Sequence, residues 1–327
     1  MIKQNRIKKN MKSVKLNKAF KMKNLYFVII LLICKSSFGQ NNGDLHIDYF
    51  GQATPKDSAL IFAPGIISMN NRLEHAGVFS SDGKEFYFSV VSKTWDTLNT
   101  YMKTYINGKW TKDELAPFSS ISGGAAEIFI NKQNTIVLFV SSGLANTSDG
   151  WLKTDFWISK RNGNKWIDPQ KLEATINNID VQWHPSISCS GHVYFGSRGF
   201  IYKAKQINDT TFEEPHELKD SLINLKGSRN AEPFIASDES FLIFSSNRSG
   251  GYGGNDLYIT FKKEDNTWTN PKNLGPEINS EEQDFSPHIT PDGKFLMFTK
   301  EKYNGNSVVS RHIYWVSTSF IEKLKEQ

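Results

Sequence analysis

Acidic, amide and imidazole side chains recur at two fixed places in a repeated pattern along this chain of 327 residues. When the five repeats are aligned with one another, one equivalent position is occupied by Ser80, Asn131, Ser188, Ala236 and Thr290, which we call the aligned residues. Four positions earlier stand Ala76, Glu127, His184, Glu232 and Ser286. Six positions earlier stand Glu74, Ala125, Gln182, Asn230 and Asp284. Converging carboxylates could bind a cation, perform acid–base chemistry on a glycoside, or simply hydrate a pore, and the sequence leaves these three readings open.

Two tryptophans lie next to these polar positions or in a polar loop. Trp183 precedes His184, and Trp151 follows Ser148-Asp149-Gly150. Aromatic faces stack on sugars and bury area in protein interfaces. We therefore expect Trp183 at the ligand site and Trp151 at an interface, with packing in the core as the open alternative for both.

Other chemistry has no signature in the sequence. There is no Gly-x-Ser-x-Gly elbow, and His-x-x-x-His and Cys-x-x-Cys pairs are absent. Beyond residue 39 the chain contains a single cysteine, Cys189, so no intramolecular disulfide is expected there. The sequence predicts no catalytic nucleophile, no metal site and no cofactor.

Short strands must position the polar residues. Each repeat contains a strand, a turn of the Asp-Gly type and a strongly apolar strand, as in residues 78–89 and 288–299. Later in most repeats an Asn-Gly or similar turn leads to an aromatic residue, and the aromatics are Trp110, Trp166, Phe212 and Trp268. The spacings of 51, 57, 48 and 54 between aligned residues, with four strands in each unit, are typical of the blades of a β-propeller.

The fifth unit lacks its last strand, and the missing piece lies at the other end of the chain. Residues 62–68 match residues 274–280 in their Pro, branched and Ser positions. The sequence therefore predicts an all-β protein with one propeller over residues 59–327, built from five four-stranded blades and closed by an N-terminal strand. Six blades are the alternative. Because first strands line the channel of a propeller, the polar residues should converge at one mouth.

The N-terminus resembles an export signal. A basic stretch ends at Lys23, an apolar run covers Leu25 to Cys34, and small residues at Ser37 and Gly39 suit cleavage before Gln40. Ten apolar residues are too few to span about 30 Å of hydrocarbon, so membrane contact is expected only through this segment. Residues 40–58 are polar and are expected to form an N-terminal tail or loop.

The charge balance differs between this segment and the rest of the chain. Residues 1–39 hold ten basic and no acidic residues, which leaves 29 basic against 34 acidic residues beyond them. A nucleic-acid partner is disfavoured, because affinity for polyanions rests on clustered Lys and Arg.

Two runs resemble a known family of repeats. Pro291-Asp292-Gly293-Lys294, followed by Phe298, is similar to the signature of the WD40-like, or PD40, propeller repeats. The run from Ser246 through Gly250-Gly251 to Asp256-Leu257-Tyr258 resembles the continuation of that repeat. Such repeats occur in the periplasmic TolB family and in many envelope proteins. The resemblance implies a propeller and does not imply one activity.

These observations favour an exported, non-catalytic propeller that binds a protein or a glycan in the cell envelope. We expect it to be a periplasmic or secreted monomer. The alternative is a glycan-acting enzyme similar to a glycoside hydrolase, with its acids among Glu74, Glu127, Glu232 and Asp284.

Overall fold

A computed structural model describes residues 45–93, 97–142 and 153–326 of the chain. The chain divides into two compact units, residues 1–42 and 43–327, and every described residue belongs to the second. The expected export signal and Trp151 lie outside the described residues. In the part of the chain that is described, no helix has the length and apolar character needed to cross a membrane.

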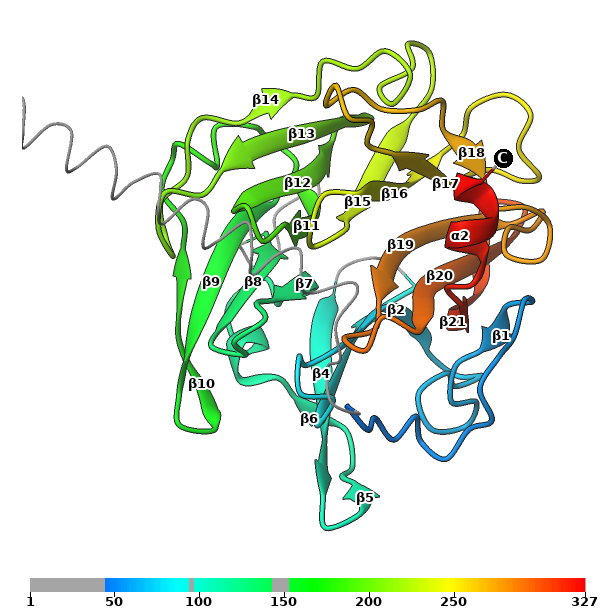
Figure 1. Cartoon of the computed structure of the whole chain (residues 1–327). Coiled ribbons are helices and arrows are strands. Elements are labelled where there is room, and N and C mark those ends of the chain that lie inside the picture. The colour runs from blue at the N-terminus through cyan, green and yellow to red at the C-terminus, as the bar shows by residue number, and fades with distance from the viewer. Residues whose placement is uncertain (1–44, 94–96, 143–152, 327) are drawn as a thin grey trace, which may run out of the picture. The chain divides into compact units, whose positions relative to one another are not determined.

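Five antiparallel sheets make up the second unit, and each is one blade (Figure 1). The first strands are β2 (Leu73–Phe79), β7 (Ala126–Ile130), β11 (Trp183–Ile187), β15 (Asn230–Ile235) and β19 (Gln283–Ile289). The second strands are β3 (Glu85–Val91), β8 (Ile136–Ser141), β12 (His192–Ser197), β16 (Phe241–Ser246) and β20 (Phe295–Asn304). The third strands are β4 (Leu98–Ile106), β9 (Asp155–Asn162), β13 (Phe200–Lys205), β17 (Asp256–Phe261) and β21 (Ser307–Ser317).

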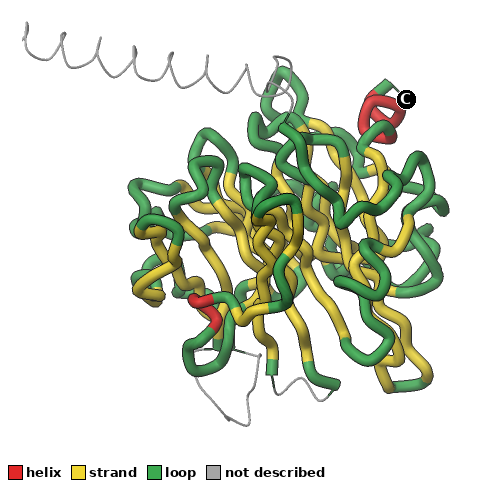
Figure 2. The backbone as a smooth tube through the Cα atoms, turned by 90° about the horizontal axis from the view of Figure 1, so that it is seen from below, coloured by secondary structure: helices red, strands yellow, loops and turns green. Residues whose placement is uncertain are grey.

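The outer strands are short. They are β5 (Lys109–Trp110) with β6 (Glu114–Leu115), β10 (Lys165–Lys171), β14 (His216–Glu217), β18 (Lys272–Asn273) and β1 (Leu60–Ile61). Within the described residues two helical segments complete the fold, η1 (Pro117–Ser119) and α2 (Phe320–Lys325), and they lie at opposite faces of the unit (Figure 2). We number the blades 1 to 5 in the order of their first strands.

The first strands form the inner ring of a propeller. Each of them contacts the next in chain order, and β19 contacts β2, which closes the ring. The predicted all-β fold with five blades is confirmed, and the six-bladed alternative is wrong for the described residues.

The N-terminal strand completes the last blade as predicted. β1 pairs with β21, with Leu60 opposite Trp315 and Ile61 opposite Tyr314. The next residue, Phe62, is fully buried among aromatic rings that include Trp315. Blade 5 thus combines strands from the two ends of the propeller. β1 covers the outer edge of β21, which would otherwise be unpaired.

Residues 45–59 precede β1 and form an irregular loop without a regular strand. In this loop Ile47 and Tyr49 are buried between blades 5 and 1. The Tyr49 hydroxyl donates a 2.8 Å hydrogen bond to Asp292, in the Pro-Asp-Gly-Lys turn of blade 5. The polar composition of residues 40–58 concealed these two apolar contacts.

The apolar second strands are buried on both faces. In β16 all six residues are buried, because one face packs on the preceding blade and the other on the following blade. Five apolar clusters fill the contacts between neighbouring blades, and Tyr194 of blade 3 and Phe244 of blade 4 share one of them. This burial on both sides explains why these strands are continuous apolar runs instead of alternating patterns.

An asparagine in three blades holds the connection that enters the next inner strand. Asn177, Asn224 and Asn279 each accept a hydrogen bond of 2.8 Å from a backbone N–H of the third strand. The same side chains donate to the carbonyl of the same strand residue, at 3.2, 3.0 and 3.0 Å respectively. These bonds fix the position along the propeller axis at which each following inner strand starts.

Candidate functional site in the central channel

Every inner strand carries a β-bulge at the same place. The register with the second strand shifts between His75 and Val78, Ala126 and Phe129, Trp183 and Ser186, Ala231 and Phe234, and Phe285 and His288. The first residue inside each bulge has a positive φ, with values of 50° at Ala76, 50° at Glu127, 51° at His184, 51° at Glu232 and 52° at Ser286. Bulges re-aim side chains, and a repeated left-handed residue without glycine is uncommon.

The second residue inside the bulge helps to maintain it. In blades 3, 4 and 5 this residue is proline, namely Pro185, Pro233 and Pro287. Proline has no N–H, so the sheet loses no ladder bond where the register shifts. The five left-handed residues are the set that the sequence placed four positions before each aligned residue.

Polar side chains from the bulges meet across the ring. One oxygen of the Glu127 carboxylate contacts Nδ1 of His184, and the other contacts Nε2 of His75. The second nitrogen of His184 lies 2.9 Å from the carbonyl oxygen of Pro287 in blade 5. Glu127 therefore links blades 1, 2 and 3, and His184 extends the network to blade 5.

Glu232 and Ser286 form the other half of this channel cluster, which we define as His75, Glu127, His184, Glu232 and Ser286. Oε2 of Glu232 accepts bonds from the backbone N–H and hydroxyl of Ser286, at 2.7 and 3.0 Å. The same hydroxyl lies 3.5 Å from Oε1 of Glu127. Both carboxylates thus contact one serine.

Four members of the channel cluster are buried and Glu232 is half-buried, and burial sets the electrostatics of the cluster. Glu127 is 1% exposed and His184 is 4% exposed. Burial alone raises the pKa of Glu127, but the adjoining imidazole groups of His75 and His184 outweigh it and hold this pKa below the usual value. Burial disfavours the charged form of His184, yet the Glu127 carboxylate outweighs it and raises the pKa of His184. The two side chains form a buried ion pair.

The remaining titratable members favour their uncharged forms. Burial lowers the pKa of His75 to about 4, with only partial opposition from Glu127. Burial and then the negative charge of Glu127 raise the pKa of Glu232. Arg311 on β21 adds a positive charge nearby and pairs with Glu301 on β20. Burial lowers the pKa of Arg311 to about 10, against the opposing fields of Glu232 and Glu127.

The other set of expected site residues does not join the cluster. Glu74 accepts bonds from Met69 N–H at 3.0 Å and Arg72 Nε at 2.7 Å, and Gln182 accepts a bond from Phe156 N–H at 3.1 Å. Asn230 accepts a 2.9 Å bond from Ser246, and Asp284 accepts a 2.8 Å bond from Ser280 N–H. Gln182 and Asn230 also donate to the carbonyl oxygens of Ile176 and Ser228, at 2.6 and 3.2 Å. These four buried side chains therefore hold the connections that enter their own inner strands.

Trp183 is half-buried and packs against the apolar cluster formed mainly by blades 2 and 3. His75 and Arg311 are the members of the site that sequence reasoning missed. Only one signal pointed to His75, since blade 1 has alanine at the bulge and a histidine immediately before it. Arg311 lies on a third strand, where no repeat marks it.

The described residues contain no group of three or more His, Cys, Asp or Glu side chains arranged to hold a metal ion. The geometry gives the reason. The oxygens of Glu127 face the ring nitrogens of His75 and His184, so these atoms pair with one another instead of facing a common point.

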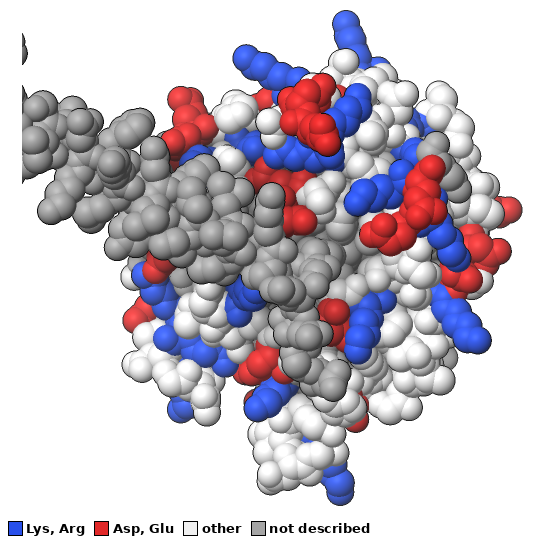
Figure 3. Space-filling model, in the orientation of Figure 1, with Lys and Arg blue, Asp and Glu red and all other residues white. Residues whose placement is uncertain are grey.

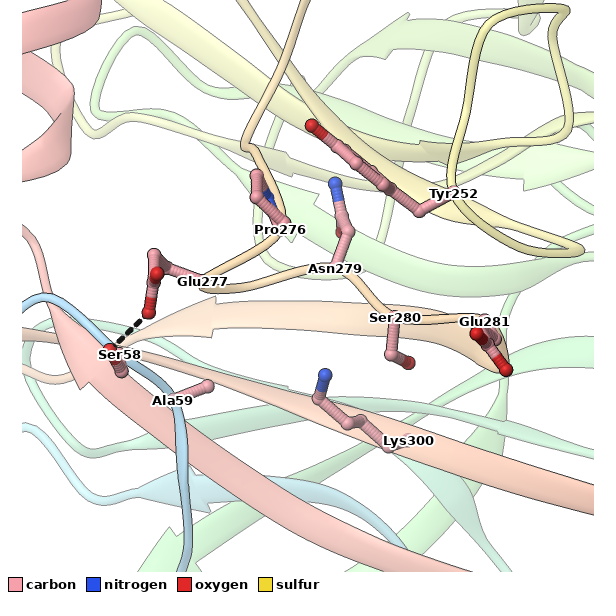
Figure 4. A pocket seen from close by; sticks show the side chains of 9 residues that line it. All are labelled: Ser58, Ala59, Tyr252, Pro276, Glu277, Asn279, Ser280, Glu281 and Lys300. Carbon is pink, nitrogen blue, oxygen red and sulfur yellow. Dashed lines mark hydrogen bonds between the residues drawn. The ribbon is translucent and has the colours of Figure 1, made fainter.

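A separate pocket of about 640 Å³ lies between blades 4 and 5 (Figure 4). It is lined by Ser58, Ala59, Tyr252, Pro276, Glu277, Asn279, Ser280, Glu281 and Lys300. No member of the channel cluster lines it.

No protein-family model matches this sequence, and no curated protein matches it. Solved structures do resemble it. The putative TolB from Agrobacterium tumefaciens is 16% identical, with 72% of both proteins covered and a TM-score of 0.43. The α-L-arabinofuranosidase from Lactobacillus brevis is 14% identical and has a TM-score of 0.46, with 77% of this protein and 91% of the arabinofuranosidase covered.

A structure described as a glycoside hydrolase is 10% identical and has a TM-score of 0.51, with 82% of this protein and 92% of the hydrolase covered. Identities this low establish a common fold and nothing about activity. The propeller that the resemblance to PD40 and TolB repeats implied is confirmed by the five sheets of the structure.

Proposed function

We propose that this chain is an exported, non-catalytic β-propeller that binds a protein or a glycan in the cell envelope. The observation that carries the proposal is the closure of the channel cluster upon itself. Both oxygens of Glu127 contact histidines, and Glu232 bonds Ser286. A ligand would then bind at the faces of the ring rather than in its centre.

A catalytic acid or base must come within about 2.6–3.2 Å of the atom whose proton it moves. Glu127 is 1% exposed, and a substrate would have to displace His75 or His184 to reach it. Displacement would leave a buried charge without its partner, at a cost of several kcal/mol. This cost supports a structural role for the channel cluster.

Export and the absence of a nucleic-acid partner are parts of the same proposal. Residues 1–39 carry the pattern of an export signal, and the rest of the chain has an acidic balance. On the face shown in Figure 3, acidic side chains of the described residues lie among the basic ones instead of leaving one basic patch. The outer edge strands of four blades are only two residues long, which limits pairing between molecules and supports a monomer.

A crosslinking pull-down tests this function. The full chain with a C-terminal tag is expressed in its own host, captured from the envelope fraction and analysed by mass spectrometry. We expect one stoichiometric protein partner or co-purifying glycan and no turnover of glycan substrates. Recovery of the chain from the cytoplasm alone, or turnover that depends on the channel cluster, would contradict the proposal.

The alternative is a glycan-acting enzyme, and one observation favours it. Glu127 and Glu232 contact the same Ser286 hydroxyl, and their environments move their pKa values in opposite directions. Pairs of carboxyl groups with separated pKa values serve as base and acid in glycoside hydrolysis. Hydrolysis screens with the wild type and Glu232→Gln test it, because this variant keeps the shape of the channel cluster. Turnover lost in Glu232→Gln would favour the enzyme.

A further inference from the structure

We propose that the pocket between blades 4 and 5 binds a neutral oligosaccharide, with the Tyr252 ring stacked on a sugar. This inference rests on the proposed binding function and names its ligand class and its site. Figure 4 shows Tyr252 on one side of the pocket and Lys300 across from it. The volume of about 640 Å³ lies within the range of small-ligand sites.

Tyr252 is an exposed aromatic residue on a loop that packing holds in place. It is 49% exposed, in the glycine-rich connection between β16 and β17. The Asp256 carboxylate accepts bonds from the backbone N–H groups of Tyr252 and Gly253, at 2.6 and 3.2 Å. The backbone that carries the ring is therefore held in place before any ligand arrives, which lowers the entropic cost of binding.

The glycines let this loop lie directly on the connection that enters blade 5. A Cβ at Gly253 would collide with the carbonyl oxygens of Ser280 and Glu282, and one at Gly254 would collide with the Gln283 side chain. Gly254 N–H also donates a 3.0 Å bond to the carbonyl oxygen of Glu282. Since residues 280 and 281 line the pocket, the same contact holds the loop of Tyr252 against this part of the lining.

The charges of the lining exclude an anionic ligand. The lining contains the carboxylates of Glu277 and Glu281 and one ammonium group, that of Lys300. Lys300 already pairs with Asp284 at 3.3 Å and donates a 2.7 Å bond to the carbonyl oxygen of Ile278. The net field is negative, so a phosphate or uronic acid would be repelled.

The remaining groups suit hydroxyl-rich molecules. Carboxylates and hydroxyls accept or exchange hydrogen bonds with sugar hydroxyls, and a tyrosine ring covers the apolar face of a sugar. A protein partner would instead require buried apolar anchors. The apolar side chains in the lining are few, besides Tyr252 only Ala59 and Pro276. The competing ligand is a basic peptide, which would form an ion pair with the carboxylate of Glu281.

The test uses the full chain, purified after export, on a printed array of neutral and acidic glycans, with affinities then measured by titration calorimetry. We expect neutral glycans to bind. Tyr252→Ala should weaken binding about tenfold or more, and Tyr252→Phe should keep it within about threefold, since the ring does the stacking. Tyr303→Ala is the matched control, because Tyr303 is 45% exposed on β20 and does not line the pocket.

Three outcomes overturn the inference: no neutral glycan bound, acidic glycans bound alone, or binding unchanged in Tyr252→Ala. A basic protein partner captured through Glu281, and lost in Glu281→Gln, would also overturn it while leaving the proposed binding function intact. Hydrolysis of a bound glycan would instead contradict the proposed non-catalytic function.

Discussion

Glu127 and His184 occupy the same position of neighbouring blades, and the bulges of β7 and β11 bring their side chains into contact. Each residue shifts the pKa of the other toward the charged form. The contact is therefore an ion pair in the middle of the ring, and it connects strands that share no backbone ladder.

Replacing Glu127 with glutamine should destabilise the fold. The variant leaves His184 buried without a counter-charge, and breaking a buried ion pair from one side costs about 3 kcal/mol or more. Urea unfolding at pH 7, followed by tryptophan fluorescence, measures the loss. Glu232→Gln is the matched control, with an expected cost below about 1 kcal/mol, because burial already favours the uncharged form of Glu232. Equal losses in the two variants would contradict the ion pair.

Glu239 should make the fold sensitive to acid. Burial alone would raise its pKa, but bonds from His192, Ser190 and Lys262 outweigh this and hold the pKa far below the usual value. A carboxyl group with a depressed pKa contributes stability above its unfolded pKa of about 4.3, and this contribution is lost as pH falls toward the folded pKa.

We therefore expect Glu239→Gln to lose about 2 kcal/mol at pH 7 and to show a shallower decline of stability than the wild type between about pH 4 and 2. Denaturant unfolding at several pH values measures both slopes. If stability declined with the same slope in both proteins, protonation of Glu239 would not be the cause of the acid sensitivity.

Phe62 should be essential for closing the ring. It is fully buried among aromatic side chains of blades 5 and 1, and Phe62→Ala should cost about 3–5 kcal/mol. Leu60→Ala is the control on the same segment, because Leu60 is 45% exposed, and we expect less than about 1 kcal/mol. Thermal unfolding compares the two, and similar melting temperatures would contradict the packing role of Phe62.

Asn224 should stabilise blade 3 through its side-chain amide. Its loss in Asn224→Ala leaves the N–H and C=O of Ile201 and the carbonyl of Leu218 without this partner. The two carbonyl oxygens keep bonds from the N–H groups of Leu218 and Asp220, so the main cost is the Ile201 N–H. A buried group without a partner costs about 1–3 kcal/mol, and we expect a loss of about 2 kcal/mol in urea. Asn208→Ala, in an exposed turn, should change stability by less than about 1 kcal/mol. An Asn224→Ala variant as stable as Asn208→Ala would show that water replaces the amide.

The blades could be predicted because their signals are local. Asn-Gly turns and apolar second strands act within a few residues, and the match of residues 62–68 to 274–280 marked the strand that closes the ring. The three asparagines at 177, 224 and 279 follow an isoleucine each time, and this repeated pair was available in the sequence as well.

The two polar sets were expected to converge because first strands line the channel of a propeller, and in a regular strand residues two apart share one face. The positive φ at Glu127, Glu232 and their equivalents breaks that alternation, and Glu74 and Asp284 turn to their own connections. For the same reason His75, one residue from the bulge and on the opposite face of a regular strand, reaches Glu127.

The sequence by itself determined the number of blades, the closing strand and the five positions where the inner strands carry comparable side chains, because spacing and turn chemistry are properties of neighbouring residues. Only the tertiary structure decided which of those side chains meet. That outcome depends on a backbone angle at each bulge and on contacts such as His75 with Glu127, which join residues that are 52 positions apart.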